Sequence, residues 1–382
     1  MSPFDKIDQL VHSQTRLSNS VPQSFSAKVL RVMVDLDRLR EPTSGLGHVA
    51  LYFGERLARR AASLRDIRFT FLVPARDVGR FGADVDYVCE SRWLKIFPFL
   101  HRHFDLWYCP HQDVAYSPVR GSKFIFTIND LNFLKEKSPA RCRARLRRIQ
   151  KFIDRASIVT TISENTAVEV RQHLQMRNVP LIVQPFGLEL KTYEHVARPA
   201  FVPSRPFLLT VGVHKRTKNY RVLVDLMEQL PEFDLVMLGN AQTQAGLELK
   251  ERLARSEARN RVHLLGVCSD EDKFWFYQHC AAVLFPSISE GMGYPPLEAM
   301  QVRRPVFVFR ESAVPEICGP HALYWSSQQS EIMAQEVRAG LKWFHEHPEF
   351  ADNAYVHGMS FSWDPVVDKY LALLRQQLEL SA

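Results

Sequence analysis

The sequence predicts an α/β protein of two domains, each built on a parallel β-sheet with helices on both faces. Short apolar runs alternate with amphipathic helical stretches in both halves of the chain, and this alternation is typical of parallel sheets. At 382 residues the chain is longer than one hydrophobic core comfortably supports. A connection with several prolines, residues 198–206, separates the halves.

The first half contains six predicted strands and three predicted helices. The strands are expected at 29–34, 69–73, 106–109, 124–127, 158–162 and 181–184, and the helices at 48–61, 140–154 and 165–175. Gly45 and Gly47 fall between the first strand and its helix. Their lack of a side chain would let a ligand approach the backbone there, so they form a candidate glycine loop.

The second half repeats the pattern. Strands are expected at 208–211, 235–238, 262–265, 281–285 and 306–309, and helices at 220–230, 245–255 and 270–279, from Glu298 onward, and finally at 365–380. The expected units are an N-terminal extension (1–27), a first Rossmann-like domain (28–198), a second (199–360) and a C-terminal helix (361–382). Ligands of such sheets bind at the carboxyl ends of the strands.

Composition narrows the class of protein. Hydrophobic residues make up 46% and charged residues 24% of the chain, as in globular proteins, and there is no apolar run long enough to cross a membrane. The polar first 27 residues do not resemble a secretory signal. The six cysteines are scattered without a C-x-x-C pair, which favours reduced thiols in the cytosol and no zinc site. Asp35 and Asp37 end the first strand and are expected to be structural rather than metal-binding.

Positive charge is concentrated in one segment. Residues 131–155 contain nine Lys/Arg and two acids, an excess equal to the net charge of +7 of the whole chain. Upstream, residues 91–104 mix basic and aromatic side chains. This combination suits an anionic membrane surface or an anionic lipid-linked ligand. It also suits nucleic acid, and a solvated helix face beside core aromatics is an equal alternative.

The most informative segment is residues 285–300, which carries Glu290 and Glu298 on either side of a glycine-containing turn. An apolar strand precedes the turn, and Pro295 and Pro296 favour the start of a helix after it. Backbone N–H groups at such a turn attract an anion such as a diphosphate. The flanking carboxylates accept hydrogen bonds from hydroxyl groups, so the arrangement suits a nucleotide sugar. An ordinary strand–turn–helix with two solvated acids is the alternative.

The spacing of these glutamates resembles the E-x7-E motif of the group 1 (family 4) retaining glycosyltransferases, in the branch that builds bacterial cell-envelope polysaccharide and lipopolysaccharide. Met292 and Tyr294 replace the common Phe and Leu of that motif. Further segments resemble the same family: the VG…KN loop at 211–219, the TIHDL turn at 127–131, the SE turn at 162–165, the SLPEI segment at 312–317 and the tail motif at 361–363. The resemblance implies the GT-B fold, with two Rossmann-like domains facing across a cleft and the C-terminal helix crossing back onto the first domain.

The resemblance also implies roles for particular residues. Glu290 would bind the donor sugar, Glu298 the ribose hydroxyls, and Lys218 with Arg216 or Lys215 the leaving diphosphate. Glu290, Lys218 and Arg216 form the catalytic set, and no metal is expected. The donor-binding set comprises Gly212, Lys215, Gly266, Val267, Gly291, Met292, Gly293, Tyr294 and Glu298.

The acceptor is expected on the first domain. The candidate residues are Gly45, Gly47, His111, Asn129 and Asp130. Asn129 stands where the TIHDL motif has histidine, and an amide cannot carry a proton at neutral pH. This departure prompts an alternative function, a non-catalytic GT-B scaffold or partner-binding subunit of a glycan-assembly complex.

The function implied is retaining, metal-independent transfer of a sugar from a GDP- or UDP-sugar to a saccharide or lipid-linked saccharide, in lipopolysaccharide, O-antigen or capsule assembly. No permanently bound cofactor and no nucleic-acid partner are expected. The expected location is the cytoplasm, with peripheral contact to the inner face of the plasma membrane.

Overall fold

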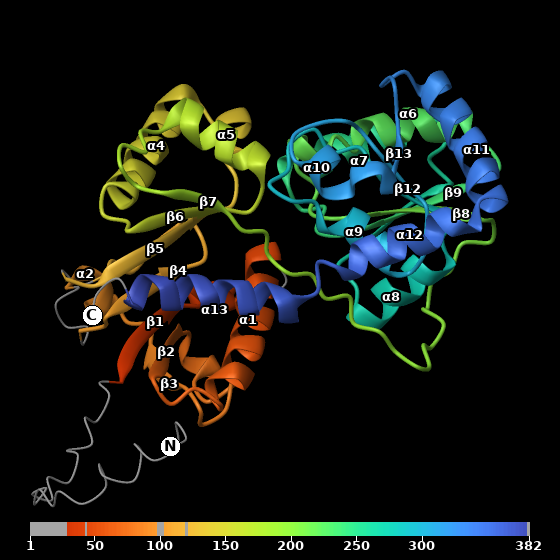
Figure 1. Ribbon diagram of the computed structural model, residues 1–382. Coiled ribbons are helices and arrows are strands. Elements are labelled where there is room, and N and C mark those ends of the chain that lie inside the picture. Colours follow the sequence, from red (N-terminus) through yellow and green to blue (C-terminus); the bar gives the residue numbers. More distant parts are fainter. Residues whose placement is uncertain (1–28, 43, 98–102, 119–120, 380–382) are drawn as a thin grey trace, which may run out of the picture.

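The computed structural model of the chain describes residues 29–42, 44–97, 103–118 and 121–379. The predicted N-terminal extension, 1–27, and parts of the basic–aromatic segment 91–104 lie outside these residues. The described chain forms two parallel sheets, each covered by helices (Figure 1).

The first sheet has seven strands in the order β3-β2-β1-β4-β5-β6-β7, all parallel. Their bounds are β1 Leu30–Asp35, β2 Ile67–Val73, β3 Asp86–Cys89, β4 Leu106–Cys109, β5 Lys123–Ile128, β6 Ile158–Thr161 and β7 Leu181–Val183. The strand order reverses between β1 and β4, and such a reversal is where ligands bind in doubly wound sheets.

The second sheet repeats this topology with six parallel strands in the order β10-β9-β8-β11-β12-β13. Its strands are β8 Phe207–Val211, β9 Asp234–Leu238, β10 Val262–Gly266, β11 Ala282–Phe285, β12 Val306–Val308 and β13 Leu323–Tyr324. The order reverses between β8 and β11, so the loops after these two strands flank the ligand-binding position of the sheet.

The helices lie on both faces of each sheet. Those of the first sheet are α1 Gly45–Ala61, α2 Arg92–Ile96, α3 Phe133–Glu136, α4 Pro139–Ile153 and α5 Glu164–His173. Those after β8 are α6 Arg221–Gln229, α7 Gln244–Ala254, α8 Asp270–His279, α9 Tyr294–Gln301, α10 Val314–Cys318, α11 Ser330–Glu346, α12 Pro348–Met359 and α13 Trp363–Glu379. The GT-B fold expected from the sequence is confirmed.

The C-terminal helix α13 returns to the first sheet and packs beside α1 (Figure 1). Tyr370 is buried against the rings of Phe53 and Tyr108, with ring centroids 5.5 and 5.4 Å apart, and its hydroxyl donates to the Gln184 carbonyl at 2.9 Å. Burial of these large rings fixes the end of the chain on the first domain. The crossing back implied by the family resemblance is therefore present.

Two helix starts differ from the sequence prediction by three residues or more. α1 begins at Gly45 rather than at residue 48, because Ser44 caps the helix by accepting the Gly47 N–H at 3.0 Å. The predicted glycine loop is therefore the first turn of a helix. α9 begins at Tyr294, before the two prolines, since proline fits the first turn, where an N–H has no helical partner.

Two short edge strands, β3 and β13, were not predicted. No residue of β3 is fully buried, and β13 has only two residues, so neither strand has a clear apolar pattern. Among the described residues, no helix combines the length and apolar character needed to cross a membrane. All six cysteines lie in the described part of the chain and are free thiols.

Candidate functional site

Glu290 lies in the loop after β11, at the point where the order of the second sheet reverses. Its Oε1 atom accepts from Lys218 Nζ at 2.5 Å and from the Ser287 hydroxyl. Its backbone N–H donates to the Ser312 hydroxyl at 2.8 Å. The side chains of Glu290 and Lys218 are only 12% and 16% exposed, so this charge pair is partly desolvated and strong. Both side-chain hydrogen bonds, from Lys218 and from Ser287, end on the same carboxylate oxygen of Glu290.

Glu298 lies one turn into α9 and is buried. Its Oε2 accepts from the Tyr277 hydroxyl at 2.6 Å and its Oε1 from Lys273 Nζ at 3.1 Å. Burial opposes a positive charge on Lys273, but the Glu298 carboxylate outweighs burial and the pKa of the ammonium is raised. Burial and the same carboxylate raise the pKa of Tyr277 well above its ordinary value. Each glutamate of the motif thus has its own lysine.

The two glycines of the motif are needed for different reasons. Gly291 lies against the first domain, and a Cβ atom there would fall 2.2 Å from the carbonyl oxygen of Asn129. Gly293 has φ +100°, a left-handed conformation that side chains disfavour. Met292 is buried beside them, and burial raises the pKa of the Tyr294 hydroxyl.

Lys218 ends a short 3₁₀ turn, Arg216–Lys218, in the loop after β8. Its ammonium also lies 4.9 Å from the centre of the Phe285 ring, a favourable cation–π distance. The loop is held down by Ser287, whose hydroxyl donates to the Thr217 carbonyl at 2.9 Å, and by Ile288, whose N–H donates to the same oxygen at 2.9 Å. The cationic loop and the Glu290 loop are therefore one hydrogen-bonded unit.

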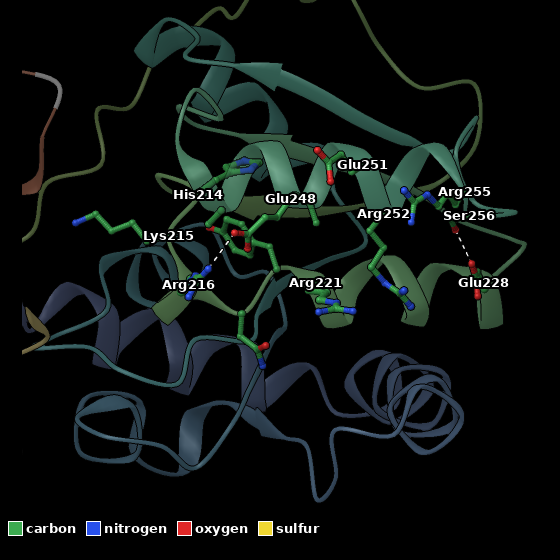
Figure 2. A pocket seen from close by; sticks show the side chains of 14 residues that line it. His214, Lys215, Arg216, Arg221, Glu228, Glu248, Glu251, Arg252, Arg255 and Ser256 are labelled. Atoms are coloured by element: carbon green, nitrogen blue, oxygen red, sulfur yellow. Dashed lines mark hydrogen bonds and ion pairs between the residues drawn. The ribbon is translucent and has the colours of Figure 1, made fainter. Parts of the chain in front are cut away.

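Arg216 and Lys215 point to different surroundings. Arg216 donates to Glu248 on α7 at 2.9 Å, whereas Lys215 extends away from that pair (Figure 2). Burial raises the pKa of Asp130, and the positive charge of Lys215 offsets part of this rise. Both line a pocket of about 670 Å³ between α6 and α7, but Glu290, Glu298 and Lys218 do not line it.

The remaining predicted donor residues lie at neighbouring strand ends. Gly212 follows β8 at φ +145°, and a Cβ there would meet the Tyr220 hydroxyl at 2.8 Å. Gly266 ends β10 at φ +75°, and Val267 after it is 63% exposed. Both glycines thus lie at the carboxyl ends of parallel strands, the edge at which such sheets bind ligands.

The acceptor candidates of the first domain are mostly buried. His111 Nε2 lies 3.0 Å from Asp37 Oδ1, and both residues are about 1% exposed. Asp35, Cys109 and His111 place donor atoms within 4.8 Å of one another. The Cys109 sulfur lies 3.9 Å from both ring nitrogens of His111, and its thiol donates to Asp35 Oδ2 at 3.6 Å. The three side chains form one buried polar cluster.

Asn129 and Asp130 lie where the two domains meet. The Asn129 side chain is buried, with its amide 3.4 Å from the Pro110 carbonyl, and its backbone oxygen faces Gly291. Gly45 and Gly47 are in the first turn of α1, where a Cβ on Gly47 would collide with the Glu41 carbonyl. The glycine at 47 thus allows close backbone packing.

Several polar contacts between the domains were not anticipated. Lys135 Nζ donates to the Ser289 hydroxyl at 3.0 Å, and Ser289 in turn donates to Asn132 Oδ1 at 2.6 Å. Thr217 donates to Glu136 at 3.3 Å. The start of the basic segment therefore contacts the two loops that carry Glu290 and Lys218.

Lys273 and Tyr277 were also missed, although the sequence contains a signal for them. They are four residues apart on a predicted helix and so share one face, which carries a cation and a hydroxyl. Which carboxylate this face meets depends on how α8 packs against α9.

The chain is similar to known glycosyltransferases in sequence. Residues 193–354 match the family model "Glycosyl transferases group 1". The chain is 21% identical over 306 residues to O-antigen chain mannosyltransferase B of Escherichia coli, covering 71% of this chain and 77% of that protein. It is 24% identical over 248 residues to the serotype-specific mannosyltransferase WbdA of E. coli, and this match covers 60% of the chain. The chain spans only 27–30% of the length of three such WbdA proteins.

Solved structures share the fold. The sucrose-phosphate synthase of Thermosynechococcus elongatus superposes with a TM-score of 0.71 at 17% identity, covering 92% of this chain and all of that chain. Anabaena Alr3699/HepE, solved with UDP and glucose, superposes with a TM-score of 0.67 at 16% identity, covering 91% of this chain and all of that one. Residues 193–354, which contain both motif glutamates and their lysines, match the glycosyl transferases of group 1, and this match covers less than half of the chain.

Proposed function

We propose that the chain is a retaining, metal-independent glycosyltransferase that moves a sugar from a nucleotide sugar to a saccharide or lipid-linked saccharide. The observation that carries this proposal is the pairing of each motif glutamate with a lysine at the strand ends of the second sheet. The pairs supply carboxylates for hydroxyl groups and cations for a diphosphate within one loop–helix unit.

Lys218 performs the central step. The leaving diphosphate gains negative charge as the bond to the sugar breaks, and a fixed ammonium stabilises that charge. In the free protein this ammonium is bound to Glu290 at 2.5 Å. The diphosphate takes Lys218 from Glu290, and Glu290 is thereby released to bind the donor sugar. Lys215 is the better second cation, because Arg216 is held by Glu248.

Glu298 binds the ribose hydroxyls. Its two oxygens are already oriented by Lys273 and Tyr277, and each has a second lone pair for a hydroxyl group. Residues around Gly266 and Val267 contact the base. The cations of the loop supply the stabilisation that a metal would otherwise give, so chelators should leave the rate unchanged.

The donor and acceptor are proposed from the relatives. These include O-antigen mannosyltransferases of E. coli and the D-rhamnosyltransferase WbpZ of Pseudomonas aeruginosa, to which the chain is 32% identical over 151 residues, 38% of each chain. GDP-mannose is therefore the first donor to test, with UDP-sugars next because HepE was solved with UDP and glucose. We propose a growing O-antigen saccharide on a lipid carrier as the acceptor.

The experiment is a donor screen with the purified chain. UDP-, GDP- and dTDP-sugars are tested for thermal stabilisation, for hydrolysis and for transfer to a mannose-containing oligosaccharide. A true donor at about one hundred times its Kd stabilises the native state by about 2.7 kcal/mol. If no nucleotide sugar stabilises the protein or is consumed, the enzymatic proposal is wrong. A non-catalytic scaffold would still bind its glycan partner, and the buried Asn129 in place of histidine is what favours it.

We also propose contact with an anionic membrane on the inner face of the plasma membrane. Arg141, Arg143, Arg147 and Lys151 are exposed on α4, and Trp93 and Ile96 of α2 are 66% and 59% exposed. Arg145 is instead bonded to Asp113 at 2.6 Å. Exposed cations beside exposed apolar side chains favour the interface of anionic lipid.

The test of membrane contact is binding to vesicles of phosphatidylglycerol and phosphatidylcholine. Charge reversal at Arg141, Arg143 and Arg147 should weaken binding strongly, since each basic residue contributes about 1 kcal/mol near such a surface. Reversal of three other exposed basic residues, Arg259, Lys342 and Lys369, is the charge-matched control. Equal loss in both variants would mean that net charge alone drives binding.

A further inference from the structure

A short segment connects the Glu290 loop with the first domain. It runs from Ser312 to the end of α10, Val314–Cys318. At its start, the Ser312 hydroxyl accepts the backbone N–H of Glu290 at 2.8 Å. Ser312 has φ +50°, which is unfavourable for a residue with a side chain. The surrounding contacts therefore hold this segment in one conformation.

At its other end the segment binds helix α5 of the first domain. Glu316 Oε1 accepts the backbone N–H of Glu164 at 2.8 Å, and Oε2 accepts that of Asn165 at 3.1 Å. The next N–H of the helix, that of Thr166, is capped locally by the Ser163 hydroxyl at 3.2 Å. The carboxylate of one domain thus completes the N-terminal cap of a ten-residue helix in the other.

This contact differs from the two side-chain contacts between the domains described above. Lys135–Ser289 and Thr217–Glu136 join pairs of side chains, whereas Glu316 binds backbone groups that are present whatever the sequence of α5. The first-turn amides and the helix dipole both favour an anion there. The attraction requires α10 to lie against the N-terminus of α5, so it exists only when the two domains are in contact.

We propose that Glu316 is a positioning residue, whose docking on α5 holds the two domains closed and, through Ser312, fixes the Glu290 loop. Closure thereby coincides with the correct placement of Glu290, whose N–H is bound by Ser312, four residues before Glu316. The docking itself stands on the geometry alone. Its effect on transfer rests on the proposed function.

The docking is tested by hydrogen exchange of the full chain without any ligand. Glu316→Ala should speed exchange of the Glu164 and Asn165 amides, and also of the Glu290 amide, by about five-fold, a typical coupling between two sites. Glu316→Gln keeps a hydrogen-bond acceptor but loses the charge, so its exchange rates should lie between those of the wild type and of Glu316→Ala. Glu311→Gln, the same change of charge in the neighbouring exposed position, should leave these amides unchanged.

The positioning role is tested by kinetics with the donor found in the screen. Glu316→Ala should lower kcat about five-fold and raise the fraction of donor lost to water, because an open interface admits water. A purely structural role would lower the amount of folded protein and leave this fraction constant.

Two results would overturn the proposal. Unchanged exchange at Glu164 and Asn165 excludes the docking, whatever the enzyme does. Faster exchange with an unchanged kcat and an unchanged hydrolysis fraction excludes the positioning role. If the wild-type chain uses no donor at all, the proposed function fails, and the exchange experiment still decides the docking by itself.

Discussion

Each glutamate of the motif is paired with a lysine, but the two carboxylates lie in different surroundings. Glu298 is held through both of its oxygens by Lys273 and Tyr277, which come from one helix of its own domain. Glu290 is held through a single oxygen, and its loop touches the first domain at Gly291 and Ser289. One end of the site is complete within the second domain, and the other depends on both domains.

This difference indicates how a donor would bind. The nucleoside end meets groups that are already oriented, so little has to be rearranged. The diphosphate and sugar end meets a lysine that is already paired, and binding there must exchange one partner for another. Affinity should therefore come mainly from the Glu298 side, and rate from the Glu290 side.

The largest expected effect is the loss of Lys218. Lys218→Met should lower kcat by about 100- to 1000-fold, as with removal of other groups that stabilise developing negative charge. Arg216→Met, in the same loop but with its side chain bonded to Glu248, is the matched control and should lower kcat far less. Steady-state kinetics with the selected donor provide the measurement. A comparable loss in both variants would show that the loop acts as a general cation and that Lys218 has no special role.

The next effect is on stability. Lys273→Met leaves the buried Glu298 carboxylate without its cation and should lower the free energy of unfolding by about 3 kcal/mol, as for other broken buried pairs. The double variant with Glu298→Gln should recover much of this loss, since no unpaired charge remains. Urea unfolding of the wild type, both single variants and the double variant measures the coupling. Strictly additive effects would contradict the pairing.

Gly291→Ala should act on the interface rather than on the fold. Its Cβ would lie 2.2 Å from the Asn129 oxygen, so the domains must separate slightly. We expect a fall in kcat of about ten-fold, which corresponds to about 1.4 kcal/mol and is comparable to the cost of overpacking. Gly293→Ala is the comparison, because its cost comes from φ +100° within one domain. Small-angle scattering should show expansion only for Gly291→Ala. Equal expansion of the Gly291→Ala and Gly293→Ala variants would show that a clash with the Asn129 oxygen is not the cause.

The smallest expected effect concerns His214, which lies in the cationic loop after β8. His214 is buried, and burial lowers the pKa of its imidazole to about 4 from the ordinary 6.5. The folded state binds this proton less readily than the unfolded state, so stability is full above pH 6.5 and declines as the pH falls toward 4. The loss between about pH 7 and pH 5.5 should be about 1 kcal/mol. Thermal unfolding of His214→Phe should show a shallower pH dependence. If the pH dependence of His214→Phe equals that of the wild type, other titrating groups cause the pH dependence.

The sequence predicted the parts of the molecule that local patterns determine. Strand–helix alternation and the spacing of Glu290 and Glu298 placed the motif at a strand end, and the structure agrees. The helix start at Gly45 was missed because glycines disfavour a helix, whereas the Ser44 side chain caps the first turn in the structure. The contact of Gly291 with Asn129 and that of Glu316 with α5 join residues more than 150 positions apart. Only the packing of the two domains brings them together, and no local pattern encodes it.

The exchange of partners at Lys218 is tested most directly by titration calorimetry with GDP and UDP, using the wild type, Lys218→Met and Glu290→Gln. If the diphosphate takes Lys218 from Glu290, then Glu290→Gln frees the lysine in advance. It should bind the nucleotide at least as tightly as the wild type while losing transfer, whereas Lys218→Met should bind it more weakly. If Glu290→Gln weakens nucleotide binding as much as Lys218→Met does, the two residues act as one fixed unit and the exchange does not occur.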